Sequence, residues 1–125
     1  MAGSFRRVAA LAAFVLAATP AFADNYPISG RWGVSTSSAP GPVDCAQLRV
    51  ITFNGNQRTD TGSGVPTYRN RTVRPNGTTE FSVVDVFTTG QISNAHTSYT
   101  LKLIDADRVD MNQQRGGLVK LRKCK

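Results

Sequence analysis

The sequence predicts an all-β protein, a small antiparallel up-and-down barrel or a sandwich of about seven or eight strands. Three observations support this fold class. Short runs rich in β-branched and alternating apolar residues recur after residue 24, tight-turn signals such as Asn54-Gly55 and Gly116-Gly117 separate them, and no segment there repeats apolar residues at the spacing of a helix. A chain of this length forms one domain with one modest core.

The first 23 residues predict a secretory signal peptide. Arg6 and Arg7 begin it, an apolar run covers residues 8–18, and Ala21-Phe22-Ala23 forms a cleavage site. The apolar run is too short for a membrane span, which takes about 20 residues. We therefore expect a periplasmic or secreted product that begins at Asp24, forms a single barrel domain over residues 24–125 and has no membrane span after cleavage.

Each strand follows from its own run and from the turn that ends it. The first strand begins near Gly30, and the run at 48–53 ends at Asn54-Gly55, from which 57–60 returns. The remaining runs, with the turn that closes each, are 67–74 with Pro75-Asn76-Gly77, 79–88 with Gly90, 98–104 with the acidic turn at 105–107, 108–112 with Gly116-Gly117, and 118–124. This spacing leaves no room for a second domain.

Two cysteines, Cys45 and Cys124, predict a structural disulfide, because paired cysteines in an exported chain are normally oxidised. Such a bond closes a loop of about 80 residues, for which the chain-entropy model gives about 4–5 kcal/mol as an upper figure. Two cysteines and a single histidine cannot supply the four ligands of a zinc site, and there is no C-x-x-C redox pair. We therefore expect no metal site.

Trp32, the only tryptophan, predicts how the barrel is closed. Gly30 lets the backbone bend two residues earlier, and the indole then fills the closed end. A cation from the last strand can lie over the indole face, and Arg122 is the candidate. The indole should therefore lie against Arg122 or an adjacent part of the last strand. We expect Gly30, Trp32 and Arg122 to close the barrel together.

Gly30-Arg31-Trp32 at the first strand, with Arg122 in the last, resembles the calycin pattern of lipocalins and related small barrels. In those families the G-x-W motif and a late arginine pack together at the closed end. "SGRW" at 29–32, followed by Cys45 and a basic C-terminus, is more weakly similar to bacterial inhibitors of serralysin-type metalloproteases, whose second cysteine lies closer to the first. In those inhibitors the segment before the barrel enters the protease cleft, which would correspond to residues 24–29 here.

No residue pattern predicts catalysis. We place His96 in an exposed turn, with no nucleophile and orienting group beside it. Asp105, Asp107 and Asp110 lack the glycine and late glutamate of an EF-hand and indicate a polar hairpin turn. Asp85, within an otherwise apolar strand, is either a paired interior acid or an outward-facing residue. We expect no enzyme and no cofactor.

The chain is basic, with a formal net charge of +7, and its cations form two groups. The candidate basic surface comprises Arg69, Arg71, Arg74, Lys120, Lys123 and Lys125. Alternation places Arg69 and Arg71 on one face with Thr67 and Val73, and Arg74 on the other. These cations could attract an anionic surface, polysaccharide or acidic protein. The alternative, which we favour at this stage, is an edge strand whose charges keep the protein soluble.

Together these patterns predict a monomeric, exported, non-catalytic binding protein of lipocalin-like architecture. Its expected partner is a small apolar ligand, an anionic envelope component or a protease; a protease inhibitor and a structural or accessory envelope protein are the alternatives. Nucleic acid is not expected, because the product is exported and has no aromatic ladder for stacking. A ligand carrier needs a hollow barrel, whereas an inhibitor barrel can be filled with side chains.

Overall fold

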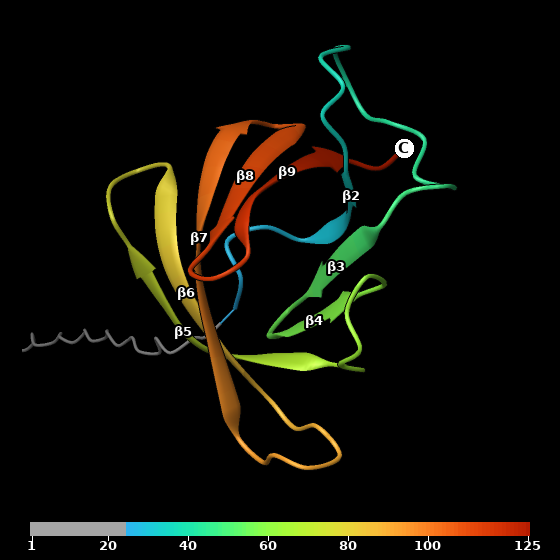
Figure 1. Cartoon of the computed structure of the whole chain (residues 1–125). Coiled ribbons are helices and arrows are strands. Elements are labelled where there is room, and N and C mark those ends of the chain that lie inside the picture. Colours follow the sequence, from blue (N-terminus) through green and yellow to red (C-terminus); the bar gives the residue numbers. More distant parts are fainter. Residues whose placement is uncertain (1–24) are drawn as a thin grey trace, which may run out of the picture.

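The computed structural model describes residues 25–125, so the expected signal peptide and the cleavage site before Asp24 lie outside the described residues. Eight antiparallel strands form a closed barrel in sequential order, and the last strand, β9, pairs with the first, β2 (Figure 1). The structure therefore confirms the all-β class and decides for the barrel over the sandwich.

The strands follow the predicted runs within a few residues. They are β2 (Gly30–Val34), β3 (Val50–Asn54), β4 (Gln57–Asp60), β5 (Tyr68–Pro75), β6 (Glu80–Phe87), β7 (Ala95–Asp105), β8 (Arg108–Gln113) and β9 (Gly117–Lys123). The largest difference is at β7, which begins three residues before the predicted run. His96 is therefore a strand residue rather than the turn residue that we expected.

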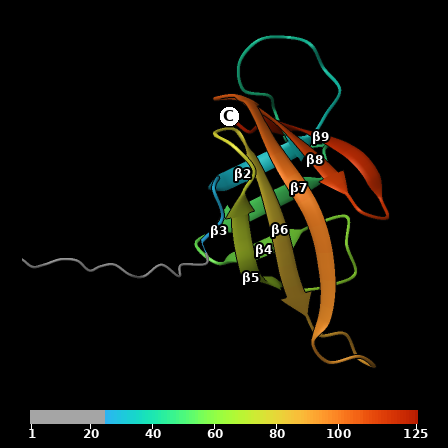
Figure 2. The same cartoon turned by 90° about the vertical axis from the view of Figure 1, so that its left-hand side faces the viewer.

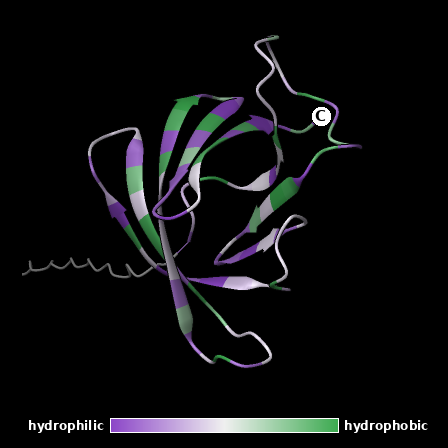
Figure 3. Ribbon diagram, viewed as in Figure 1, coloured by the Kyte–Doolittle hydropathy of each residue, from purple (hydrophilic) through white to green (hydrophobic). Residues whose placement is uncertain are grey.

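Alternation along the strands builds one apolar core inside the barrel. Figure 3 shows apolar and polar residues alternating along β7 and β8. The inward positions include the least exposed side chains: Ile51, Phe53, Val83, Leu101, Val109, Met111 and Leu121, each 0–1% exposed. Large side chains thus occupy the barrel interior from several strands, which follows from the period of two in a pleated strand.

The residues before β2 also join the core. Tyr26 is buried, its ring meets Phe53 edge-on at a centroid distance of 5.0 Å, and its backbone N–H donates to the Gly55 carbonyl at 3.1 Å. Trp32 donates its indole N–H to the Ser29 carbonyl at 3.0 Å. This short segment is therefore packed and hydrogen-bonded against the barrel.

The long connection between β2 and β3 projects from the barrel beside the C-terminus (Figure 1). The predicted disulfide, Cys45–Cys124, ties it to the end of the chain with a Cα–Cα distance of 5.6 Å. Gly33 permits this close approach, since a Cβ at that position would lie 2.7 Å from the Cys45 sulfur. The connection therefore covers the outer face of β2 and β9.

A β-bulge in β5 changes which side chains share a face. Asn70 pairs with Asp85, but Thr72 rather than Arg71 takes the next place, opposite Val84. As a result Arg69 and Arg74 lie on the same outer face, whereas Val73 turns inward opposite Val83. The prediction from simple alternation, which placed Arg74 on the face opposite Arg69 and Val73 on the same face as Arg69, was therefore wrong. Figure 2 shows β5 beside β6 in this wall of the barrel.

Candidate functional site

Asp85 forms the centre of a polar network inside the barrel. Its side chain is fully buried, and its carboxylate accepts hydrogen bonds from the hydroxyls of Tyr26 at 3.0 Å and Tyr99 at 2.7 Å. It also accepts from Arg58 Nε at 2.8 Å and from the Asn70 amide at 3.3 Å. Of the two sequence-based alternatives, Asp85 is therefore the paired interior acid.

A second acid completes the charge balance of this network. Arg58 lies 4.0 Å from the Asp60 carboxylate, which accepts two hydrogen bonds from Arg49 at 2.9 and 2.7 Å. The guanidinium of Arg58 also lies over the ring of Tyr68, 3.8 Å from its centroid. Two buried carboxylates thus compensate two arginines, as buried charges require.

Burial, with the Asp85 charge acting in the same direction, raises the pKa of the Tyr26 and Tyr99 hydroxyls well above the ordinary tyrosine value. Both phenols are therefore protonated donors at neutral pH. Asp85 and Arg58 line none of the five hollows described for residues 25–125, whereas Tyr99 lines one of them and Asp60 lines another. The network therefore fastens the N-terminal segment to the strands of the barrel, and its central ion pair lies away from these hollows.

Sequence reasoning missed most of this network. It singled out Asp85 but not Tyr26, Arg58 or Asn70. These residues could have been identified as polar residues at inward-facing strand positions. In β5, however, the inward positions can be assigned only once the bulge between Asn70 and Thr72 is known.

Trp32 is 3% exposed, as the closing role requires, but its cation differs from the expected one. Lys123 lies over the indole with its Nζ 5.2 Å from the ring centroid, because Lys123 is the residue that pairs with Trp32. Arg122 pairs with Gly33 and so lies on the opposite, outer face of β9. The expected contact with Arg122 is therefore wrong, whereas the alternative, a contact with an adjacent part of the last strand, is confirmed by Lys123.

Arg122 instead supports the connection that covers the barrel. It is 2% exposed, and its guanidinium donates to the backbone carbonyls of Ser37, Ala39 and Gly41, the last at 2.6 Å. No ion pair recorded among residues 25–125 includes Arg122. The peptide carbonyls of the loop are therefore the recorded hydrogen-bond partners of this buried cation.

We call residues 36–42 the braced loop. Residues 36–40 are all exposed, although the carbonyls on their inner side are bound to Arg122. Hollows of about 280 and 290 Å³ lie at its base; both include Arg108 and Arg122. The loop is therefore held over the outer face of β9 mainly through its backbone, while the side chains of residues 36–40 face solvent.

The arginine face, which we define as Arg69, Arg71 and Arg74, lies on the outer side of β5. All three side chains are exposed, and none takes part in an ion pair recorded for the described part of the chain. Arg71 lies 3.2 Å from the ring nitrogen Nε2 of His96 on β7. Three positive charges thus share one wall with no carboxylate paired to them.

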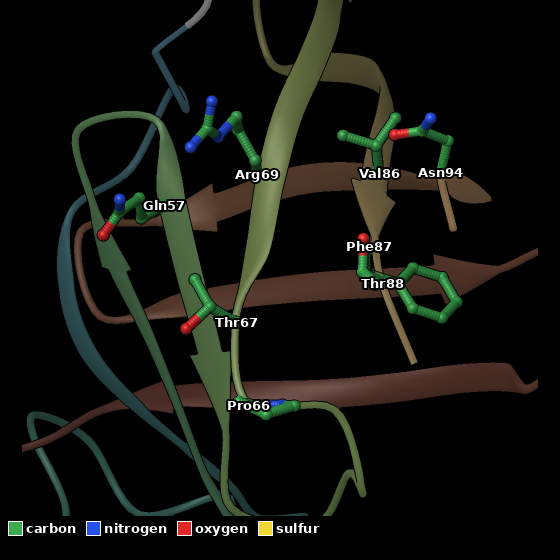
Figure 4. Close-up of a pocket in the computed structure, with 8 residues that line it drawn as sticks. All are labelled: Gln57, Pro66, Thr67, Arg69, Val86, Phe87, Thr88 and Asn94. Atoms are coloured by element: carbon green, nitrogen blue, oxygen red, sulfur yellow. The ribbon is translucent and has the colours of Figure 1, made fainter. Parts of the chain in front are cut away.

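Arg69 lines a surface hollow of about 350 Å³. Figure 4 shows Arg69 on β5 with Gln57 on one side and Val86 and Asn94 on the other. No residue of β5 after Arg69 pairs with β4. Residues 71–75 therefore form a free strand edge, where charged side chains hinder pairing with the strand of another molecule. Arg69 lies within the paired part of the strand, so edge protection does not explain it.

The C-terminal lysines do not extend this face. Lys120 lies 3.8 Å from Asp110, Lys123 covers Trp32, and Lys125 follows β9 at the end of the chain. In the closed barrel three strands separate β5 from β9 in either direction, so the two groups of cations lie on opposite walls. The single basic surface that the sequence suggested is therefore divided.

The remaining candidates have structural roles. Asp105 ends β7, where it accepts from the Asp107 backbone and pairs with Arg108 at 2.8 Å, as the predicted polar turn requires. In residues 25–125 no group of three or more histidines, cysteines or acids is placed to hold a metal ion.

The chain matches no family model, no curated protein and no solved structure. Within the part that the structure describes, no helix has the length and apolar character needed to cross a membrane. The calycin resemblance is thus supported as far as a closed eight-stranded antiparallel barrel with one disulfide.

Proposed function

We propose that the protein is an exported, non-catalytic binding protein that recognises an anionic component of the cell envelope through its arginine face. The observation that carries this proposal is the exposed position of Arg69 on the rim of a hollow, together with Arg71 and Arg74 and without a paired carboxylate. Exposed arginines suit phosphate and carboxylate groups, because the planar guanidinium forms two parallel hydrogen bonds to either.

The filled interior argues against the other partner class, a small apolar ligand carried within the barrel. Tyr26, Trp32 and Phe53 are each less than 10% exposed and contribute large rings to the core, and the Asp85 network takes up the polar centre. A carrier of the lipocalin kind needs an open cavity among such residues. The outer surface is therefore the better candidate for recognition.

The test is binding of the exported chain to anionic probes. Dextran sulfate and polygalacturonate represent glycans with sulfate or carboxylate groups, and phosphatidylcholine vesicles with and without phosphatidylglycerol represent a lipid surface. An arginine near an anionic surface contributes about 1 kcal/mol. The triple variant Arg69→Gln/Arg71→Gln/Arg74→Gln should therefore bind about 100-fold more weakly, and the affinity of the wild type should fall with salt.

A matched control removes equal charge elsewhere. Lys102→Gln/Arg115→Gln/Lys120→Gln changes three exposed cations outside the arginine face. Equal losses in the two triple variants would mean general attraction to a basic protein and would contradict a specific face. Absence of binding to all of the probes would contradict the proposal as a whole.

A further inference from the structure

A hollow of about 580 Å³ lies on the outer wall of the barrel and crosses β6, β7 and β8. Of its lining residues, Val83 and Tyr99 point into the core, where they are 1% and 4% exposed, so the hollow lies on the opposite, outer side of these strands. The outward-facing residues that line it are Ser82, Val84, Ser98, Thr100 and Asn112, and we call them the polar hollow. Its volume is within the range of small-molecule sites, about 300–1,000 Å³.

The polar hollow has hydrogen-bonding groups but no charge. No charged side chain lines it, and Val84 is its one outward-facing apolar residue. The Asn76 amide donates to Ser82 Oγ at 2.6 Å, whereas no side-chain hydrogen bond of Ser98, Thr100 or Asn112 is recorded within residues 25–125. Hydroxyls and amides both donate and accept. The wall therefore offers several neighbouring groups that match sugar hydroxyls, which also donate and accept.

The arginine face borders the polar hollow. Arg74 on β5 is the register partner of Ser82 on β6, so their side chains are neighbours on the same outer wall. Arg71 extends across this wall to β7, where it contacts His96 at 3.2 Å, two residues before Ser98. Figure 2 shows β5, β6 and β7 side by side. The cations and the uncharged polar groups therefore form one continuous surface.

The charges beyond the other side of the polar hollow are balanced. The next outward row along the strands consists of register partners on β6, β7, β8 and β9: Glu80, Lys102, Asp110 and Lys120. Two acids and two lysines add no net charge. The arginine face has no carboxylate paired to it in the described part of the chain. An anionic group that reaches this surface is therefore attracted to its β5 side.

We propose that this wall binds an anionic glycan, with the anionic groups of the glycan on the arginine face and the hydroxyls of adjoining sugar units in the polar hollow. The inference rests on the proposed function and names the ligand class of the same site. The surface extends over three inter-strand spacings of about 4.8 Å, from β5 to β8, which is about 14 Å. This length exceeds a single sugar ring, so the ligand is an oligosaccharide or a polysaccharide segment.

A lipid surface fits this wall less well. Adsorption to a membrane combines cations with apolar side chains that enter the interface. The large apolar side chains exposed among residues 25–125 are Ile92, Ile104 and Leu118, and none of them belongs to the arginine face or lines the polar hollow. A membrane would therefore use the charge of this wall alone, whereas a glycan uses both the charge and the hydrogen-bonding groups.

The experiment compares two anionic probes by titration calorimetry with the disulfide-bonded exported chain. A short oligogalacturonate carries carboxylates and hydroxyls, whereas polyphosphate carries charge without sugar hydroxyls. Ser98→Ala/Thr100→Val removes two hydroxyls from the polar hollow with little change of shape. This variant should bind oligogalacturonate about tenfold more weakly than the wild type, because neutral hydrogen bonds are lost. It should bind polyphosphate as well as the wild type does.

The matched control is Thr52→Val/Thr59→Val. These two threonines are register partners on β3 and β4, away from the polar hollow, and this variant should bind both probes as the wild type does. Far-UV circular dichroism checks that both variants are folded. Equal binding of oligogalacturonate by the wild type and by folded Ser98→Ala/Thr100→Val would overturn the inference, as would an equal loss in the control.

Amide chemical-shift mapping of the wild type locates the ligand without any substitution. Oligogalacturonate should shift the backbone signals of residues 82–84, 98–100 and 112–114 together with those of β5, whereas polyphosphate should shift mainly those of β5. Shifts confined to β5 with both probes would overturn the glycan inference and leave the arginine face as an anion site. Binding to phosphatidylglycerol vesicles and polyphosphate without binding to oligogalacturonate would do the same. Absence of binding to every anionic probe would contradict the proposed function as well.

Discussion

Replacing Asp85 with asparagine tests whether the interior network holds the barrel together. The substitution keeps the side-chain volume but removes the charge that Arg58 faces at 2.8 Å. The nearest remaining carboxylate, that of Asp60, lies 4.0 Å from Arg58 and already accepts two hydrogen bonds from Arg49. An asparagine amide would also place N–H donors toward the donors of two tyrosines.

The expected cost follows from the burial of both partners. Asp85 is 0% exposed and Arg58 is 2% exposed, so water cannot replace the lost interaction. Removal of one partner from a buried ion pair costs about 3–5 kcal/mol. This is a large share of the roughly 5–15 kcal/mol by which a domain is stable. Asp85→Leu/Arg58→Met removes both charges and should cost less than Asp85→Asn, since no unpaired charge is left behind.

The assay is urea denaturation with the disulfide intact, followed by the fluorescence of the single tryptophan and by far-UV circular dichroism. Asp110→Asn is the control, because its partner Lys120 is half-exposed and lies 3.8 Å away. We expect the control to lose less than about 1 kcal/mol. If Asp85→Asn also loses less than about 1 kcal/mol, as a surface substitution does, the network does not stabilise the fold as we argue.

Three further predictions concern stability. The pKa values of Tyr26 and Tyr99 are raised in the folded protein, so as the pH rises the unfolded chain loses these protons first. The free energy of unfolding should therefore fall above about pH 10, by up to about 1.4 kcal/mol per pH unit for each tyrosine. The Tyr26→Phe/Tyr99→Phe variant should show a weaker fall, and a fall equal to that of the wild type would count against this linkage. Trp32→Ala should cost about 3–5 kcal/mol in urea denaturation, since a buried aromatic ring is lost, and a loss of under about 1 kcal/mol would refute the closing role. Reduction of Cys45–Cys124 should lower the midpoint of thermal unfolding, with about 4–5 kcal/mol as the upper figure for this loop, whereas an unchanged midpoint would show that the bond is not structural.

The sequence by itself determined the all-β class, the approximate strands and the disulfide, whereas the closed barrel is decided by the pairing of β2 with β9. A strand's apolar alternation and the turn residues that end it are local properties, so β3, β4 and β8 lie close to their predicted runs. Two cysteines allow a single intramolecular pairing, and the structure contains it. The burial of Trp32 was also predicted, because the largest side chain of a small domain belongs in its core.

Only the tertiary structure decided which side chains meet. The bulge at Arg71 shifts the register of β5 by one residue, which reverses the faces of Val73 and Arg74 and brings Asn70 to Asp85. The register between β2 and β9 places Lys123 opposite Trp32 and turns Arg122 outward, toward the braced loop. A strand's period of two makes each such shift a change of face, and register depends on hydrogen bonds between strands far apart in the chain, which no local pattern contains.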